Sequence, residues 1–371
     1  MLKSVFDRSV VDDIAGRIGA VHKTFEREAF VKETAAALGP LELKERSALI
    51  ARSLARRLPR DFRAALGVLV ASLGPDDGGG GIVGFGGFRY LPYNNFVGLH
   101  GLEDPDASLD ALELFTKYFS AEFDIRSFIV RHPDKTLRRI RRWSRHDDWR
   151  VRRLASEGTR PRLPWAPRLP EFVSNPSWVL SLLEGMRSEP HEAVRRSIAN
   201  SLNDISKDHP DRVLALAEAW LTENNSEAPR VAQIRHALRT LTRKGDARAL
   251  KLLGVDAGNV PRLRTFELRA KRSYIGGELI FDYQIEAERE GRYALTYAIH
   301  YVKASGRISA KIFRLTEKDL AAGEVLSGTK RHSLRQMTTR RHYPGRHAVE
   351  LRANGTVLAS RGFDLTDVAS G

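Results

Sequence analysis

The first part of the chain places apolar residues at the spacing of amphipathic helices. Apolar stripes fall within residues 5–14 and 25–38, and two more patterns run over 42–58 and 61–73. An apolar residue at every third or fourth position lines one face of a helix, so we predict four consecutive helices. Asp61 is placed to cap the fourth of them. Helix pairs that follow one another at roughly forty residues hint at a helical repeat array.

Residues 74–98 interrupt this pattern with four consecutive glycines and a group of aromatic residues. Glycine destabilises a helix because it loses much backbone entropy on folding, so we predict a glycine-rich loop or extended insertion here. The GFGGF motif lacks the lysine and hydroxyl residue of a P-loop, which argues against a nucleotide site. We expect the aromatic side chains to anchor the insertion to the helices, with contact to a partner as the alternative.

Helical periodicity returns from about residue 106 to 253, and an internal repeat becomes visible. Three segments begin alike, at His132-Pro133, Asn175-Pro176 and His209-Pro210. Each opens one helical pattern, crosses a short polar turn and enters a second helical pattern. A repeat of about 40 residues built from two helices is typical of HEAT repeats. Such repeats stack into a curved solenoid, and its concave face is the usual binding surface.

The second helices of these pairs carry arginine in register, at Arg152, Arg195 and Arg235. Stacked repeats would turn this recurrence into a ladder of positive charge. The whole chain has a formal net charge of +15 and a pI near 10.1, which favours a polyanionic partner, with nucleic acid ahead of a membrane surface. We therefore favour a groove that follows backbone phosphates, with an ordinary solvated face as the alternative.

From about residue 264 the period changes from that of helices to the alternation of strands. Runs of five to ten residues place Tyr, Ile, Val and Phe at every second position, and Asn354-Gly355 is a strong hairpin signal. Six or seven antiparallel strands with one polar face predict an immunoglobulin-like sandwich. We therefore predict a multidomain protein, with an all-α HEAT-like solenoid over 1–258 and an all-β immunoglobulin-like sandwich over 259–371. The basic residues of 330–342 either reach a second patch of the polyanion or form a plain exposed loop.

The composition of the chain excludes some kinds of site and indicates the cellular compartment. The chain has no cysteine, which excludes disulfides and thiolate metal sites. Its histidines are scattered and form no HExxH pair, so we expect neither a metal nor another cofactor. The sequence contains no apolar run of about 18 residues and begins without the apolar region of a signal peptide. We expect a soluble, monomeric cytoplasmic protein with no membrane partner.

Three acids occupy places that suggest a site, although each of them alone could also be a solvated or ion-paired surface residue. Glu122 borders an apolar stretch, Glu157 ends the second helix of one repeat, and Asp204 lies in the second helix of the next. Stacked repeats would bring them together beside the arginine ladder, although acids repel a DNA backbone. Cleavage of an N-glycosidic bond would explain them, because carboxylates stabilise the cationic sugar of its transition state and can orient water. Trp165 could hold a cation by cation–π contact or, equally, pack between repeats.

Several long blocks then carry a family resemblance: GFRYLPYNNFVGLHGL, SAEFDIRSFIVRHP, WSRHDDWRVRRLASEGTRPRLPWA and EAVRRSIANSLNDISKDHP. The chain resembles the bacterial HEAT-like-repeat DNA alkylation repair glycosylases, the AlkC/AlkD group. Within it, the chain is most similar to the AlkC branch, which includes members with a C-terminal immunoglobulin-like domain. The resemblance implies a monofunctional glycosylase that excises cationic alkylated bases, 3-methyladenine and also 3-methylcytosine, from duplex DNA. It also implies that the enzyme works without a base-flipping pocket and initiates base excision repair.

Carried over to matching positions, the resemblance implies an acidic site of Glu122, Glu157 and Asp204, with Trp165 as the aromatic partner. The residues that we expect to bind DNA, the ladder positions included, are Arg152, Arg153, Arg195, Arg196, Arg235 and Trp149. Some of these arginines could pair with the acids instead. No Schiff-base lysine stands out, which argues against strand-nicking lyase activity. One rival hypothesis is a non-catalytic nucleic-acid-binding scaffold in which the acids are structural. The other is a scaffold for an acidic protein, which leaves the acids and Trp165 unexplained.

Overall fold

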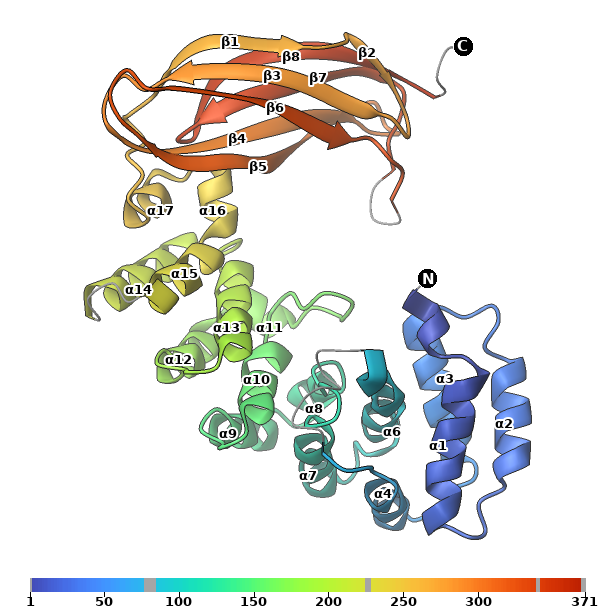
Figure 1. Cartoon of the computed structure of the whole chain (residues 1–371). Coiled ribbons are helices and arrows are strands. Elements are labelled where there is room, and N and C mark those ends of the chain that lie inside the picture. Colours follow the sequence, from blue (N-terminus) through green and yellow to red (C-terminus); the bar gives the residue numbers. More distant parts are fainter. Residues whose placement is uncertain (1, 77–84, 224–227, 338–340, 368–371) are drawn as a thin grey trace. The chain divides into compact units, whose positions relative to one another are not determined.

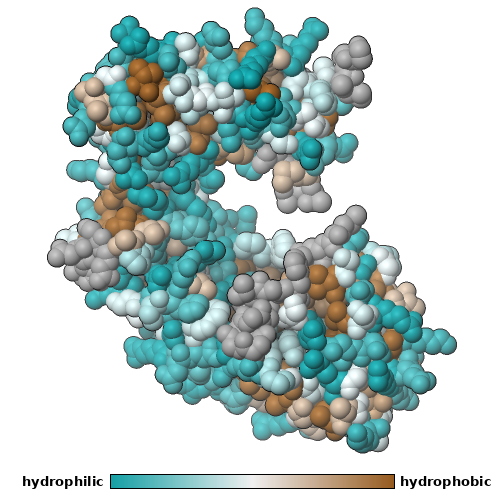
Figure 2. Space-filling model, viewed as in Figure 1, coloured by the Kyte–Doolittle hydropathy of each residue, from teal (hydrophilic) through white to brown (hydrophobic). Residues whose placement is uncertain are grey.

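The computed structural model describes residues 2–76, 85–223, 228–337 and 341–367 (Figure 1). The chain divides into two compact units, residues 1–205 and residues 206–371. The first unit is helical, and the second joins the last helices to two β-sheets. Hydrophilic residues cover most of the face seen in Figure 2, with hydrophobic residues scattered among them. Within the described residues, no helix has both the length and the hydropathy needed to cross a bilayer.

The four helices predicted at the start of the chain are confirmed. After a 3-10 helix at Leu2–Val5 they are α1 (Arg8–Val21), α2 (Arg27–Ala36), α3 (Leu43–Ala55) and α4 (Phe62–Ala71). The Asp61 side chain accepts a hydrogen bond from the backbone N–H of Ala64, so it caps α4 as expected.

The predicted insertion over 74–98 is wrong in its second half. Residues 77–84 lie outside the described residues, but a 3-10 helix follows at Phe85–Tyr90 and α6 spans Leu91–His100. Tyr93 and Phe96 are buried in this helix, as expected of side chains that anchor the segment. The helix forms because a proline in its first turn sets the backbone angle, and the apolar side chains that follow pack inward.

The helix pairs predicted from the repeated motif are also confirmed. After α7 (Pro105–Phe115) and α8 (Ile125–Arg131), the first pair is α9 (Pro133–Trp143) with α10 (Trp149–Gly158). After the short α11 (Pro170–Ser174), the second pair is α12 (Ser177–Gly185) with α13 (Glu192–Ile205). In the second unit, the third pair is α14 (Pro210–Glu223) with α15 (Ala228–Ala237), followed by α16 (Arg239–Lys244) and α17 (Ala247–Leu252).

Within the first unit, the second helices of neighbouring repeats pack side by side, as α10 and α13 show (Figure 1). Small residues allow the close approach, and the Oγ of Ser156 donates to the Oγ of Ser197 at 2.5 Å. Gly158 ends α10 against α8, where a Cβ would stand 2.6 Å from a methyl group of Ile125. The C-terminal end of α10, which carries Glu157, is therefore held close to the elements before it.

The second unit continues with eight described strands in two sheets. The strands are β1 (Arg262–Leu268), β2 (Arg272–Tyr274), β3 (Glu278–Glu286), β4 (Gly291–Val302), β5 (Ile308–Leu320), β6 (Val325–Ser333), β7 (Gly345–Ala353) and β8 (Thr356–Thr366). The sheet orders are β1-β3-β6 and β2-β8-β7-β4-β5. The prediction of purely antiparallel pairing is wrong at one edge, because the three-residue β2 runs parallel to β8.

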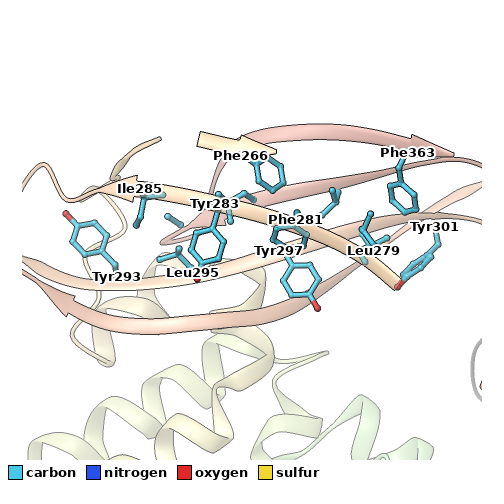
Figure 3. Close-up of a cluster of buried hydrophobic side chains, with 14 of the residues drawn as sticks. Phe266, Leu279, Phe281, Tyr283, Ile285, Tyr293, Leu295, Tyr297, Tyr301 and Phe363 are labelled. Carbon is cyan, nitrogen blue, oxygen red and sulfur yellow. The ribbon is translucent and has the colours of Figure 1, made fainter. Parts of the chain in front are cut away.

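The core of the β-rich part follows the predicted alternation. Figure 3 shows Phe266, Phe281, Leu295 and Phe363, from β1, β3, β4 and β8, within one buried cluster. The hairpin predicted at Asn354-Gly355 joins β7 to β8, and both residues have the positive φ that such a tight turn requires. The predicted domain boundary at residues 258 and 259 falls between α17 and β1.

Candidate active site

Glu122, Glu157 and Trp165 face one cleft of about 330 Å³ in the first unit. The cleft is bordered by the start of α3, the turn before α8, the end of α10 and the segment that follows α10. Its polar lining consists of Lys44, Ser120, Glu122, Arg153, Glu157 and Arg160. Its apolar lining consists of Leu43, Phe88, Leu91, Phe119, Phe123, Leu163, Pro164 and Trp165. Two acids thus share a concave surface with aromatic rings.

Glu122 is held by a small network around Arg153. The Nη2 atom of Arg153 lies 3.0 Å from Glu122 Oε2, and its Nη1 atom donates to Ser120 Oγ at 2.9 Å. The Ser120 hydroxyl in turn donates to Glu122 Oε2 at 2.7 Å. The same Nη2 atom lies 3.9 Å from Glu157 Oε2. Arg153 therefore stands between the two acids of the cleft and fixes their separation.

Asp204 joins the site through a residue that the sequence analysis missed. Arg160 is buried, and its Nη1 atom donates to Glu157 Oε1 at 2.5 Å while its Nε atom donates to Asp204 Oδ2 at 2.9 Å. Both carboxylates are buried as well. Because α10 and α13 pack together, the acid of one repeat reaches the acid of the next through one guanidinium group. Asp204 is not among the residues that line the cleft and contributes to it through Arg160.

The electrostatics keep Glu157 ionised. Burial by itself raises the pKa of this carboxyl group, because a low-dielectric surrounding disfavours charge. The guanidinium groups of Arg153 and Arg160, together with the Ser197 hydroxyl, outweigh burial and hold the pKa below its usual value. A carboxylate of this kind can stabilise a cation that develops beside it without first losing a proton.

Trp165 presents its ring to solvent at the cleft. The side chain is 65% exposed, which contradicts the alternative that it packs between repeats. Its backbone has a φ of 63°, in the left-handed region that non-glycine residues seldom adopt. A residue in that conformation is held there by its surroundings, and such residues cluster at functional sites.

With this geometry in place, the chain can be set beside known proteins. A model of the family described as DNA alkylation repair enzyme matches residues 119–241, and a model of the C-terminal Ig-like domain of the uncharacterised protein YhaZ matches residues 262–367. The "Uncharacterized protein YhaZ" of Bacillus subtilis (strain 168) is 34% identical over 98% of this chain and 99% of its own length. The chain belongs to the DNA alkylation repair enzyme family.

A solved structure specifies the branch. The Pseudomonas fluorescens alkylpurine DNA glycosylase AlkC, bound to DNA containing an abasic site analog, superposes with a TM-score of 0.89. It is 36% identical, and the match covers 98% of this chain and 99% of that chain. The fold is therefore AlkC-like from end to end, and the predicted helical solenoid followed by an immunoglobulin-like domain is confirmed.

In this AlkC-like chain, two arginines of the predicted ladder bind the protein itself. Arg152 contacts both carboxylate oxygens of Glu189 at 2.8 Å and donates to the carbonyl oxygens of His146 and Asp147. Arg195 donates in the same way to the carbonyl oxygens of the two residues before His191. Each guanidinium group closes the turn that precedes its own helix, which gives the recurrence in register a structural cause.

The remaining residues that we expected to bind DNA differ in accessibility. Arg196 is 66% exposed and pairs with Glu192 one turn earlier on α13. Arg235 lies on α15 in the second unit, with its Nη2 atom 3.8 Å from Glu317 Oε1. Trp149 stacks on the ring of His191, with centroids 4.0 Å apart and an interplanar angle of 6°. Of these side chains, Arg196 is the one best placed to exchange its partner for a phosphate group.

Three further charged residues around the cleft had no recognisable signal in the sequence. Arg126 donates to the carbonyl oxygens of Gly158, Arg160 and Pro167, and so holds both ends of the segment that carries Trp165. Lys44 reaches the cleft from α3. The third, Asp124, is buried, and this burial raises the pKa of its carboxyl group to about 6.

The side chains of the cleft that could act as metal ligands are the carboxylates of Glu122 and Glu157, and both are already paired with arginine. Within the described part of the chain, no group of three or more histidine, aspartate or glutamate side chains is arranged to hold a metal ion. What the cleft offers is fixed negative charge, an exposed indole face and an apolar lining, and this set suits the stabilisation of a cation.

Proposed function

We propose that this protein is a monofunctional DNA glycosylase that hydrolyses the N-glycosidic bond of cationic alkylated bases in duplex DNA. Its substrates are 3-methyladenine and 3-methylcytosine, and its reaction initiates base excision repair. The observation that carries the proposal is the convergence of Glu122, ionised Glu157 and the exposed ring of Trp165 on one cleft. The likeness of the whole chain to an alkylpurine DNA glycosylase supports it.

The proposed reaction needs little from the enzyme beyond charge and water. Alkylation at N3 gives the base a positive charge, so the base leaves as a neutral molecule when the bond to C1′ breaks. The positive charge then moves to the sugar, where the carboxylates of Glu122 and Glu157 stabilise it, and water adds to C1′. One carboxylate accepts the proton of that water.

Trp165 supplies the aromatic contact in this scheme. The face of an indole ring attracts a cation within about 6 Å of its centroid by about 0.5–2 kcal/mol. Because the cationic base is already a good leaving group, the enzyme does not have to enclose it in a pocket that activates it. We propose that excision proceeds without base flipping, as the resemblance to the AlkC branch implies, in contrast to most enzymes that act on bases in DNA.

The partner in this proposal is duplex DNA containing alkylated bases. The formal net charge of +15 favours a polyanion, and AlkC, the solved relative, is bound to DNA. We propose Arg196 as a phosphate contact on the first unit and Arg235 on the second. Arg152 and Arg195 contribute mainly by holding the turns that present α10 and α13. Arg153 keeps the acids apart, and Trp149 supports the turn at His191.

The test is base release by the purified full-length protein from methylated duplex DNA in the presence of EDTA. We expect free 3-methyladenine and 3-methylcytosine, with no strand break until alkali is added. Glu157→Gln should slow release by at least about 100-fold, because it removes the charge that stabilises the transition state. Glu28→Gln is the matched control, since it makes the same chemical change at an exposed position of α2 and should release base at the normal rate.

Thermal unfolding of both variants shows whether the loss of release reflects chemistry or misfolding. Wild-type protein that binds the DNA but releases no base would contradict the proposal and favour the non-catalytic nucleic-acid-binding scaffold. Release in which Glu157→Gln matches the wild type would keep the glycosylase activity and move its site elsewhere.

A further inference from the structure

Lys44 stands at a place that its own helix disfavours. It is the second residue of α3, where the exposed N–H groups of the first helical turn carry partial positive charge. Acidic residues are stabilising at such positions, and Glu45 beside it follows that rule. A cation there, partly buried, is opposed by both the helix dipole and desolvation.

Three groups around the cleft hold the ammonium group of Lys44. Its Nζ atom donates to the backbone carbonyl oxygen of Trp165 at 2.6 Å, across 121 positions of the sequence. The same atom lies 4.7 Å from the ring centroid of Phe123. Burial lowers the pKa of Lys44, while the buried carboxyl group of Asp124 raises it. Asp124 is itself held by the side-chain amide of Asn95, which donates to both carboxyl oxygens.

The residue that Lys44 binds is the one whose position most needs an external support. Trp165 has a left-handed backbone and a ring that is mostly exposed, so side-chain packing does not hold the indole in place. Arg126 binds carbonyl oxygens at residues 158, 160 and 167, which lie on either side of Trp165. The hydrogen bond from Lys44 acts at Trp165 itself, the tip of the segment.

We propose that Lys44 is a positioning residue: by binding the Trp165 carbonyl from α3, it fixes the indole ring at the cleft beside Glu122 and Glu157. The proposal rests on the proposed glycosylase function and adds the device that aims its aromatic group. In this role Lys44 acts through Trp165 and not through a contact of its own with DNA. A small displacement of a positioned group can cost up to 100-fold in rate, so the device matters for catalysis.

The kinetic test measures single-turnover release of 3-methyladenine with enzyme in excess over methylated duplex. We expect Lys44→Met to slow release about tenfold while the Kd for the duplex changes less than twofold. Lys44→Arg, which keeps a cationic donor, should restore most of the rate. Lys32→Met on the exposed face of α2 removes the same charge and should behave as wild type.

A double-variant cycle separates this role from a direct one. If Lys44 acts through the indole, Lys44→Met should add no further loss in a Trp165→Ala background. Independent losses that multiply would overturn the proposal. So would a Lys44→Met variant whose main defect is weaker DNA binding, because that result would make Lys44 a phosphate contact.

A spectroscopic readout tests the contact without any activity. In protein labelled with 5-fluorotryptophan, the ¹⁹F resonance of Trp165, assigned by its loss in Trp165→Phe, should shift or change its line width in Lys44→Met and in Lys44→Gln. The other tryptophan resonances should stay in place, which also shows that the variants are folded. An unchanged Trp165 resonance would overturn the proposal. Should wild-type protein release no base, the glycosylase would fail while this measurement still decides whether Lys44 holds Trp165.

Discussion

The helical and β-rich parts of this chain differ in whether they bury charged side chains. Among the described residues, every carboxylate or guanidinium side chain that is buried lies on the helices or their connections. These residues are Asp124, Arg126, Arg150, Glu157, Arg160, Glu189, Asp204 and Arg230. The described residues of the β-rich part bury neutral polar side chains and histidines, such as Thr296, Asn354 and His332, but no acid, arginine or lysine.

This difference in buried charge distinguishes the β-rich part, which is a scaffold, from the helical part, which carries the candidate site. Removing an ion from water costs several kcal/mol, so a sandwich whose alternation turns its charges outward avoids the cost. The repeats around α10 and α13 accept it, and they offset it with hydrogen-bonded pairs such as Arg160 between Glu157 and Asp204. Fold stability alone would be served as well by apolar side chains. Buried, ionised acids that face a cleft therefore indicate chemistry.

The largest loss of stability is expected from removing the guanidinium group of Arg160, which two buried acids of the helical part share. Arg160→Met leaves Glu157 and Asp204 buried without their common partner, and we expect it to lower the free energy of unfolding by about 3–5 kcal/mol. Urea titration followed by circular dichroism measures the change. Arg196→Met, made at an exposed position of α13, should change it by less than about 0.5 kcal/mol. A loss of less than about 0.5 kcal/mol for Arg160→Met as well would mean that Glu157 and Asp204 find other partners.

An apolar deletion in the β-rich part should have a somewhat smaller effect of a different kind. Phe281 is completely buried in the cluster of Figure 3, so Phe281→Ala should cost about 3 kcal/mol through lost burial and a residual cavity. Because no charge is involved, we expect the loss to be the same at pH 5 and pH 8. Tyr274→Ala, at an exposed position of β2, serves as the control in the same titration. A pH-dependent loss at Phe281 would contradict this account.

The smallest expected effect is a pH dependence of stability caused by the buried Asp124 of the helical part. Its carboxyl pKa is about 6 in the folded protein and 3.8 ordinarily, so in that interval the folded state holds a proton that the unfolded state releases. The free energy of unfolding contributed by Asp124 therefore falls as the pH rises. We expect the stability of Asp124→Asn relative to wild type to increase by about 1 kcal/mol between pH 5 and pH 8. Urea titrations at both pH values measure it, and a pH-independent difference would show that Asp124 ionises normally.

Much of the architecture could be predicted because it depends on neighbours in the sequence. The repeated motifs at residues 132, 175 and 209 and the alternation after residue 264 mark helices and strands through local periodicity. The second half of the predicted insertion was wrong because Pro92 and the apolar residues after it outweigh the preceding glycines. The parallel edge strand escaped prediction because pairing direction is decided by residues about 90 positions away, where β2 meets β8.

The candidate site, too, could be predicted from the sequence only in part. Residue types and spacing singled out Glu122, Glu157, Asp204 and Trp165 from the sequence, since acids and an aromatic residue stand out in a basic, repeating helical pattern. Only the tertiary structure showed Arg160 joining two acids and Lys44 bound to the Trp165 carbonyl. Such contacts depend on how repeats stack and where long, flexible side chains end, and no local pattern encodes either. The sequence alone determined the repeats and singled out the candidate acids, and packing decided which charges meet.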